Sequence, residues 1–168
     1  MIVAVQDANV LIDLANAGLL DRLPLPGFDF CVLDAVLGEV LDAVQRTAVD
    51  AAIASGCLRV CSMSSAETER AATLRHSDEH LSLPDVLSLG LAQSRGGILL
   101  TGDRPLRELA ESLGVETHGV LWVLEHLVRD AGLSPLDAMD ALDAMLAQGS
   151  RLPSAECTRL RNQWSVSP

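Results

Sequence analysis

The sequence predicts an α/β protein, a three-layer α/β/α sandwich with a central, mostly parallel sheet and a helical C-terminal extension. Short apolar runs alternate with helical patterns along most of the 168 residues. Hydrophobic residues make up 49% of the chain and charged residues 21%, which is typical of a globular domain rather than a disordered one. The length suits one domain that buries roughly 70% of the unfolded chain's surface. No apolar run approaches the ~20 residues of a membrane span.

The first half of the chain is predicted to contain three strands, each followed by helices. The strands are residues 2–6, 28–33 and 57–63, and the helices are residues 8–23, 35–44, 47–55 and a segment that begins after Ser64. Apolar residues recur with helical spacing after the first strand until Pro24 breaks the pattern. Ser64 and Glu67 have the spacing of a capping box, which predicts where the last of these helices begins.

The second half continues the alternation and then becomes wholly helical. Its predicted elements are a helix from Ser82 to Arg95, a strand at 97–101, a helix from Asp103 to Gly114, a strand at 115–118, and helices at 119–131, 134–148 and 154–163. Pro135 directly follows the capping residue Ser134, as expected for the first position of a helix. In such folds, ligands bind at the carboxyl ends of the strands. Asp7 and Asp103 follow two of the predicted strands.

The composition excludes several kinds of chemistry. The twelve basic residues are all arginine, and the chain has no lysine and no tyrosine, so a Schiff-base lysine, a P-loop lysine and a tyrosyl nucleophile are excluded. The net charge of −11 argues against broad nonspecific binding to nucleic acid. It does not exclude an acidic metal site that acts on a phosphodiester, because bound divalent cations invert the local charge.

Cysteine usage and the N-terminal sequence indicate a cytoplasmic protein. The N-terminus has no basic flank and reaches Asp7 after six residues, so we do not expect a signal peptide. The four cysteines are therefore expected to be reduced. Residues Cys57, Cys61, His76 and His80 have nearly the spacing of a zinc finger. The cysteines lie in a predicted strand, which would hold their sulfurs ~13 Å apart, so we do not expect a zinc site.

Four segments of the sequence together resemble the PIN domain. They are DANVLIDL (7–14), VLGEVL (36–41), LSLPDVLSLGLA (81–92) and ILLTGDRPLRELA (98–110). Their order is similar to the PIN pattern of an Asp-x-Asn after the first strand, a Glu on the helix after the second, an Asp at the start of a mid-chain helix, and a Thr-x-Asp after the fourth strand. The resemblance covers roughly residues 1–120 as the α/β core. Residues 121–168 are then a helical C-terminal extension of the same domain, and the segment 119–133 resembles a bacterial and archaeal PIN subgroup.

The resemblance implies a metal-dependent ribonuclease. By that likeness, Asp7, Glu39, Asp85 and Asp103 would be the catalytic, metal-binding acids for Mg2+ or Mn2+, with Asn9 and Thr101 as supporting polar residues. Many PIN proteins are VapC-type toxins, which implies RNA as substrate and an antitoxin protein as partner. Arg104 and Arg107 follow Asp103 closely and are candidates for contacts to RNA phosphates. The apolar stripe on the helix 134–148 could form a homodimer or partner surface.

The physical chemistry of carboxylates supports the same residues. Hard divalent ions prefer oxygen ligands, and Mg2+ usually keeps several waters beside one or two carboxylates. Four acids in one pocket raise one another's pKa, and a bound cation relieves that repulsion. The ion would also activate water and stabilise the charge that develops on a phosphate.

Each acid also has a structural interpretation. Asp7 and Asp103 precede helices as N-caps, and Asp85 could close a capping box with Ser82. Glu39 lies outside the apolar stripe of its predicted helix. An alternative function is therefore a catalytically weak or inactive PIN-fold module that binds a partner protein or RNA. A haloacid-dehalogenase-like phosphatase and a response-regulator receiver are excluded because both need a lysine. A dinucleotide-binding fold is excluded because no G-x-G-x-x-G follows the first strand.

Overall fold

A five-stranded sheet forms the centre of the molecule. The computed structural model describes residues 1–75 and 81–165. The strands are β1 (Ile2–Gln6), β2 (Phe28–Leu33), β3 (Arg59–Cys61), β4 (Ile98–Leu100) and β5 (Thr117–His118). They lie in the order β3-β2-β1-β4-β5 and every neighbouring pair is parallel, so the predicted mostly parallel sheet is wholly parallel in the described residues. All five carboxyl ends therefore lie at one edge.

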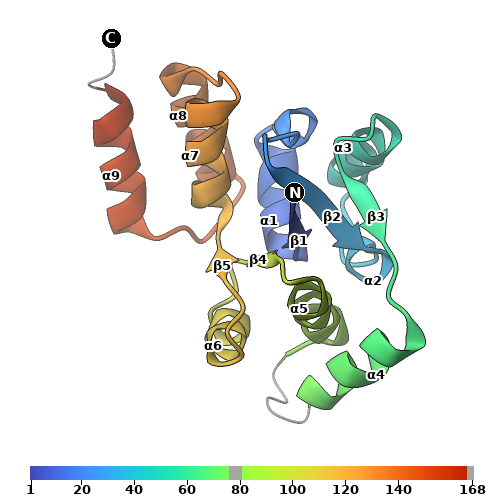
Figure 1. The fold of residues 1–168 in the computed structure, drawn as a ribbon. Coiled ribbons are helices and arrows are strands. Elements are labelled where there is room, and N and C mark those ends of the chain that lie inside the picture. The colour runs from blue at the N-terminus through green and yellow to red at the C-terminus, as the bar shows by residue number, and fades with distance from the viewer. Residues whose placement is uncertain (76–80, 166–168) are drawn as a thin grey trace.

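Helices cover both faces of this sheet, which confirms the predicted three-layer sandwich (Figure 1). On one side lie α1 (Ala8–Asn16), α3 (Ala43–Ala54) and α7 (Val120–Asp130). On the other side, α5 (Leu83–Arg95) packs against β1, β2 and β4, α6 (Arg104–Ser112) packs beside it, and α4 (Ser65–Leu74) covers the outer surface of α5. A short α2 (Asp34–Leu37) follows β2.

The C-terminal helices α8 (Pro135–Ala147) and α9 (Ser154–Ser165) pack beside α7 and α1. Arg159 of α9 pairs with Glu125 of α7 at 2.8 Å. The hydroxyl of Ser150, which follows α8, donates a hydrogen bond to the carboxylate of Asp13 in α1. These contacts join the helical C-terminal segment to the layer that covers the sheet.

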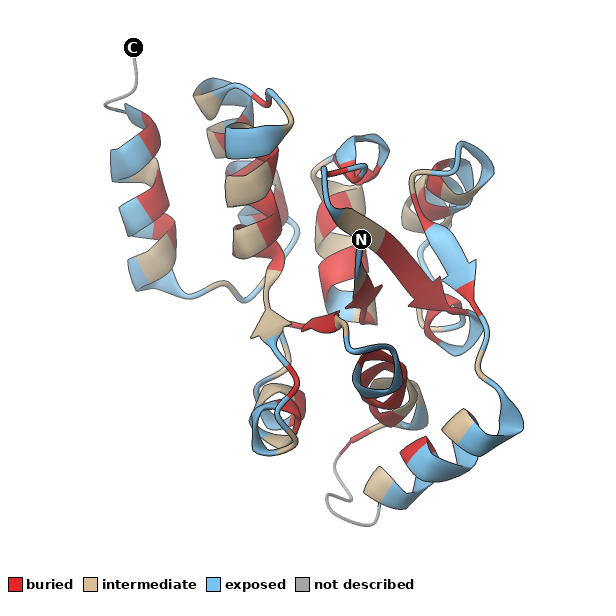
Figure 2. Ribbon diagram, viewed as in Figure 1, coloured by how far each residue is buried: buried red, intermediate tan, exposed pale blue. Residues whose placement is uncertain are grey.

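The core is continuous through all three layers. The central strands and the inner side of α5 are buried, whereas α4 is largely exposed (Figure 2). Val5, Cys31 and Leu99 lie in register on adjacent strands and are fully buried. Because helices cover both faces, the central strands β1, β2 and β4 are mostly apolar, as is typical of parallel sheets.

The prediction of one helix is wrong. Residues 35–44 were expected to form a single helix, but α2 ends at Leu37 and α3 does not begin until Ala43. Asp42 caps α3 by accepting hydrogen bonds from the backbone N–H groups of Val44 and Gln45, at 2.9 and 3.0 Å. This cap overrides the apolar periodicity, so Leu41 and Val44 are 87% and 79% exposed instead of buried.

The other boundaries differ from the predictions by smaller amounts. The helix predicted over 8–23 ends at Asn16, because Gly18 adopts a positive φ of 65°, and a separate 3-10 helix spans Leu20–Arg22. The strands predicted over 57–63, 97–101 and 115–118 are shorter at both or one of their ends. The capping box of Ser64 and the position of Pro135 at the start of α8 are confirmed.

The contact between α4 and α5 depends on Gly90 of α5. A Cβ atom at Gly90 would lie 2.4 Å from the Cβ of Ala71 in α4. We expect Gly90→Ala to lower the free energy of unfolding by about 1–3 kcal/mol, because the helices must separate to admit a methyl group. Urea unfolding measures the loss. At Gly102, the nearest atom to a new Cβ is at 4.0 Å, so Gly102→Ala is the control and a similar loss there would contradict this account.

Candidate active site

The carboxyl ends of β1 and β4 bring Asp7 and Thr101 together. Gln6 and Leu100 are paired in the sheet, and the backbone N–H of Asp7 donates to the carbonyl of Leu100 at 3.0 Å. The hydroxyl of Thr101, the first residue after β4, donates a hydrogen bond to Oδ2 of Asp7. Adjacent parallel strands thus place two side chains that are 94 residues apart in direct contact.

Asp7 is a buried carboxyl group, with only 2% of its surface exposed. It caps α1, because Oδ1 accepts hydrogen bonds from the backbone N–H groups of Asn9 at 2.6 Å and Val10 at 3.4 Å. Burial raises the pKa of Asp7 to about 6, against the opposing effect of the hydrogen bonds from Thr101 and the backbone, and the charge of Asp85 raises it further. The site therefore strongly favours a compensating positive charge or a proton.

Asp103 joins this group through Thr101. Its backbone N–H donates to Oγ1 of Thr101 at 3.0 Å, so one hydroxyl bridges Asp7 and the backbone of Asp103. Oδ1 of Asp103 caps α6 by accepting from the backbone N–H of Leu106 at 2.8 Å. The N-cap interpretation of both strand-end aspartates is confirmed. A cap uses one side of each carboxylate and is compatible with a second role.

Asp85 and Glu39 lie together beside the same edge. Asp85 forms a capping box with Ser82, in which the two residues exchange hydrogen bonds at 2.9 and 3.2 Å. Burial raises the pKa of Glu39, the charge of Asp85 raises it further, and a hydrogen bond from Ser82 acts in the opposite direction. The charge of Asp85 therefore acts on both Asp7 and Glu39.

Glu39 is not on a helix, contrary to the sequence prediction. It lies in the turn after α2, and its backbone N–H donates to the carbonyl of Val36 at 3.0 Å. The chain turns here because α2 stops at Leu37. Its position in a turn, partly buried, is what allows Glu39 to approach Ser82 and Asp85.

The donor set of this edge is entirely oxygen, which fits a hard divalent cation. Across residues 1–75 and 81–165, no three His, Cys, Asp or Glu side chains are close enough together to hold a metal ion. Mg2+ does not require such a cage, because it commonly binds through one or two carboxylates and retains water. Asp7, with its raised pKa, is the acid whose charge a cation would relieve most.

The predicted supporting residues have different surroundings. Asn9 is exposed at the start of α1 beside Asp7. Arg104 is highly exposed and pairs with Glu108 at 2.7 Å. Arg107 instead donates hydrogen bonds to the carbonyl of Thr101 at 2.9 Å and to Thr117 at 3.3–3.4 Å. Arg107 therefore holds α6 against the ends of β4 and β5, and a phosphate contact by either arginine stays a prediction.

The sequence interpretation missed two buried polar residues near the acids. Gln6 precedes Asp7, and Ser88 lies one turn after Asp85; both are fully buried. Within the described residues, neither the amide of Gln6 nor the hydroxyl of Ser88 has a hydrogen-bond partner. A glutamine at the end of an otherwise apolar strand was the signal that could have identified Gln6.

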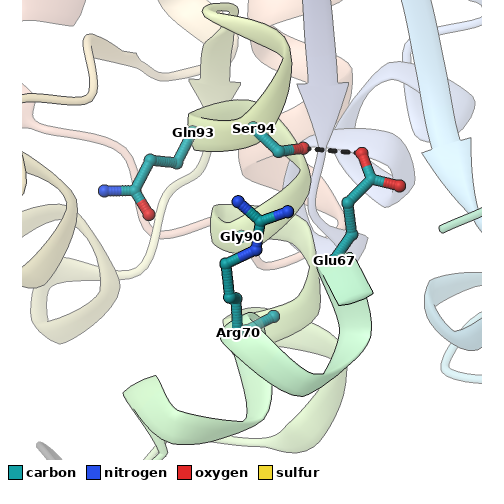
Figure 3. Close-up of a pocket in the computed structure, with 6 residues that line it drawn as sticks. Glu67, Arg70, Gly90, Gln93 and Ser94 are labelled. Atoms are coloured by element: carbon teal, nitrogen blue, oxygen red, sulfur yellow. Dashed lines mark hydrogen bonds between the residues drawn. The ribbon is translucent and has the colours of Figure 1, made fainter. Parts of the chain in front are cut away.

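The cavity between α4 and α5 includes none of the predicted acids. A cavity of about 300 Å3 between α4 and α5 is lined by Glu67, Arg70, Ala71, Gly90, Gln93 and Ser94. In this cavity Ser94 donates a hydrogen bond to Glu67, and the side chain of Arg70 lies over Gly90 (Figure 3).

The residues with nearly the spacing of a zinc finger lie near β3 or outside the described residues. Cys57 lies before β3, where its thiol donates to the carbonyl of Asp21, and Cys61 ends that strand. His76 and His80 lie outside the described residues.

The parallel sandwich and its acidic edge define an α/β protein with a candidate site for a hard cation. Residues 3–165 match the family DUF3368, described as a PIN domain. The chain therefore belongs to the PIN-domain family, which confirms the resemblance found in its sequence. A comparison of the sequence with curated proteins found no match. The fold is thus that of a family whose members are generally nucleases and typically use divalent metal ions. Within the described part, every helix is too short or too polar to cross a membrane.

Proposed function

We propose that this protein is a metal-dependent ribonuclease that hydrolyses RNA phosphodiester bonds with Mg2+ or Mn2+ bound at the edge that carries Asp7, Glu39, Asp85 and Asp103, directly by one or two of these carboxylates and through water by the others. The observation that carries the proposal is the hydroxyl of Thr101, which joins Asp7 to Asp103 across two neighbouring strands. The effect of Asp85 on the pKa of Asp7 and of Glu39 supports a single site for these acids.

Each residue has a task that follows from its surroundings. The bonds from Thr101 and from the start of α1 fix the orientation of the Asp7 carboxylate. The capping boxes and caps at Asp85 and Asp103 do the same for those side chains, so little side-chain freedom is lost when they bind. A bound divalent ion supplies the positive charge that activates water and stabilises the phosphate during displacement. The chain needs no lysine for this chemistry.

A cleavage assay tests the proposal. Purified protein should cleave single-stranded RNA in Mg2+ or Mn2+, and EDTA should stop the reaction. Asp103→Asn should reduce cleavage strongly, because Asn keeps the cap on α6 but loses the negative charge. The absence of cleavage at any concentration of either metal, together with intact capture of a partner, would favour the alternative of a binding module.

We also propose that the protein is the toxin of a toxin–antitoxin pair. The net charge of −11 suits a basic partner, and the exposed Leu41 and Val44 offer apolar contacts. Expression of this chain alone should arrest growth, and co-expression of a small basic protein encoded by the neighbouring open reading frame should restore it.

The exposed Leu136 and Leu146 on α8 are a candidate surface for a homodimer, which light scattering after size-exclusion chromatography would test. A monomer at all concentrations would contradict the dimer.

Divalent metal should also stabilise the folded protein. An ion that binds only the folded state at 100 times its Kd adds about 2.7 kcal/mol to the free energy of unfolding. We therefore expect millimolar Mg2+ or Mn2+ to raise the Tm by several degrees. Asp85→Asn should reduce this rise, while Asp140→Asn on the exposed side of α8 should not. A Tm that does not respond to either metal would contradict the proposed site.

A further inference from the structure

Two polar side chains of the described residues are fully buried and unpaired. Gln6 ends β1 and Ser88 lies in α5, and neither is exposed to solvent. Within the described part of the chain, Oε1 and Nε2 of Gln6 and Oγ of Ser88 have no hydrogen-bond partner. An unpaired buried polar group lowers stability, so most such groups are paired with protein or with ordered water. These three atoms therefore need a ligand that satisfies them.

Both side chains face the layer between β1 and α5. Asp7 has an extended backbone and caps α1 on the opposite side of the sheet, so the preceding residue, Gln6, faces α5. Gly90 of α5 faces α4, because a Cβ atom there would lie 2.4 Å from the Cβ of Ala71. Ser88 lies about 160° around the helix from Gly90, at 3.6 residues per turn, and thus faces the sheet.

The two residues also lie at the same level along the strand. The helix α5 leads into β4, which is parallel to β1, so α5 runs antiparallel to β1. After the helix, Gly97 lies against the start of β1, where a Cβ atom would be 2.3 Å from the carbonyl oxygen of Val3. From that level, α5 rises by about 10 Å between Arg95 and Ser88. The strand rises by about 10 Å between Val3 and Gln6, so the amide and the hydroxyl lie opposite each other.

Asp85 lies one turn before Ser88 on the same side of α5. Its Oδ2 accepts from the backbone N–H of Ser82 at 2.9 Å, while its Oδ1 accepts no hydrogen bond from any described residue. Helix residues three positions apart have Cβ atoms ~5–6 Å apart. A bridging water suits that spacing, because two consecutive hydrogen bonds span about 5.5 Å.

The surroundings favour water over an ion in this layer. Val32 and Leu100 are paired with Gln6 in the sheet and are fully buried, so the neighbouring strand positions are apolar. An ion enclosed here would lose its hydration with only the carboxylate of Asp85 beside it, which is costly. A neutral water avoids that cost and pairs with the amide and the hydroxyl.

We propose that Gln6 and Ser88 bind one enclosed water molecule, which donates a hydrogen bond to Oδ1 of Asp85 and fixes this carboxylate in position. The water can donate to Oε1 and accept from Nε2 along the edge of the Gln6 amide, and its second lone pair accepts from the hydroxyl of Ser88. These hydrogen bonds satisfy a buried water fully. Gln6 and Ser88 are therefore positioning residues, and their effect on cation binding rests on the proposed function.

A high-resolution crystal structure tests the water directly. We expect one peak within hydrogen-bond distance of the Gln6 amide, Oγ of Ser88 and Oδ1 of Asp85, and the same peak in crystals grown with EDTA. A direct hydrogen bond between Gln6 and Ser88, or no density between them, would overturn the proposal. Because this water needs no metal, the result is independent of the proposed function.

The variants Gln6→Met and Ser88→Ala, alone and together, test whether the two residues share one ligand. Each single variant leaves the other side chain and the water with fewer partners, so each should lower the Tm in EDTA by a few degrees. The double variant removes both polar groups and should lose less than the sum of the two single losses. Additive effects of either sign would show two independent groups and overturn the proposal.

Binding of Mn2+ to the same variants separates positioning from packing, with free Mn2+ measured by electron paramagnetic resonance. Each single variant should bind Mn2+ about tenfold more weakly than wild type, as is typical of residues that support a metal ligand. Gln93→Met, on the exposed part of α5, is the matched control and should bind as wild type does. Wild-type affinity in Gln6→Met and Ser88→Ala would overturn their positioning role. If wild type binds no Mn2+, the proposed function fails, and the crystal and Tm results still decide this inference.

Discussion

Replacement of Asp7 by Asn is expected to lower the rate of RNA cleavage by about 100-fold or more, since loss of a residue that only supports a metal ligand already costs 10–100-fold. The side chain of Asn has the shape to keep the cap on α1, because its oxygen can accept from the N–H groups of Asn9 and Val10. It removes the negative charge and places an NH2 group where Oδ2 accepts from the hydroxyl of Thr101. Single-turnover cleavage of a labelled RNA at saturating Mn2+ measures the effect.

Asp42 provides the matched control. It caps α3 as Asp7 caps α1, with two backbone N–H groups donating to its carboxylate, but it is exposed. Asp42→Asn should therefore leave the cleavage rate within about twofold of wild type. If both variants lose activity equally, Asp7 acts through the stability of a helix. If Asp7→Asn cleaves at the wild-type rate, the acidic edge is not the active site.

The same substitution should make the metal-free protein more stable. The pKa of Asp7 is raised from 3.8 to about 6 in the folded state, so the folded protein binds the proton more tightly than the unfolded chain does. Stability therefore falls as pH rises from about 4 to 6, and the full cost is present above pH 6. A difference of about 2 pKa units corresponds to about 3 kcal/mol. Asp7→Asn removes this cost.

Urea unfolding in EDTA at several pH values measures this effect. At pH 7.5 we expect Asp7→Asn to unfold with a free energy up to about 3 kcal/mol higher than wild type, and near pH 4 the two proteins should agree. Excess Mn2+ should reduce the difference at pH 7.5, because the cation stabilises only the wild-type site. A variant that is less stable than wild type at pH 7.5 would show that the buried carboxylate is stabilised by its hydrogen bonds despite its burial.

The sequence predicted the sheet more accurately than the helix ends. Strands such as Phe28–Leu33, which is apolar except for Asp29, are mostly apolar runs between turn residues, and parallel sheets covered on both faces select for this pattern. The division between α2 and α3 could not be found by periodicity, because Leu41 and Val44 continue the apolar spacing while lying exposed on the surface. Apolar spacing predicts a helix wrongly where the leucine and valine residues serve the surface, for example in contacts with a second molecule, and not the core.

The sequence predicted the site only for residues that directly follow a strand. Asp7 and Asp103 follow strands, and parallel strands end at one edge, so their proximity followed from the fold. The bridge formed by Thr101 and the approach of Glu39 to Ser82 depend on side-chain contacts between distant segments.

Anomalous diffraction from crystals grown with Mn2+ would locate the ion directly. If oxygen atoms from separate parts of the chain bind it, the map will show a peak about 2.0–2.3 Å from carboxylate oxygens of Asp7, and of Asp85 or Asp103, at the carboxyl ends of β1 and β4. A peak bound elsewhere, or none at this edge in crystals whose protein cleaves RNA with Mn2+, would contradict the assignment.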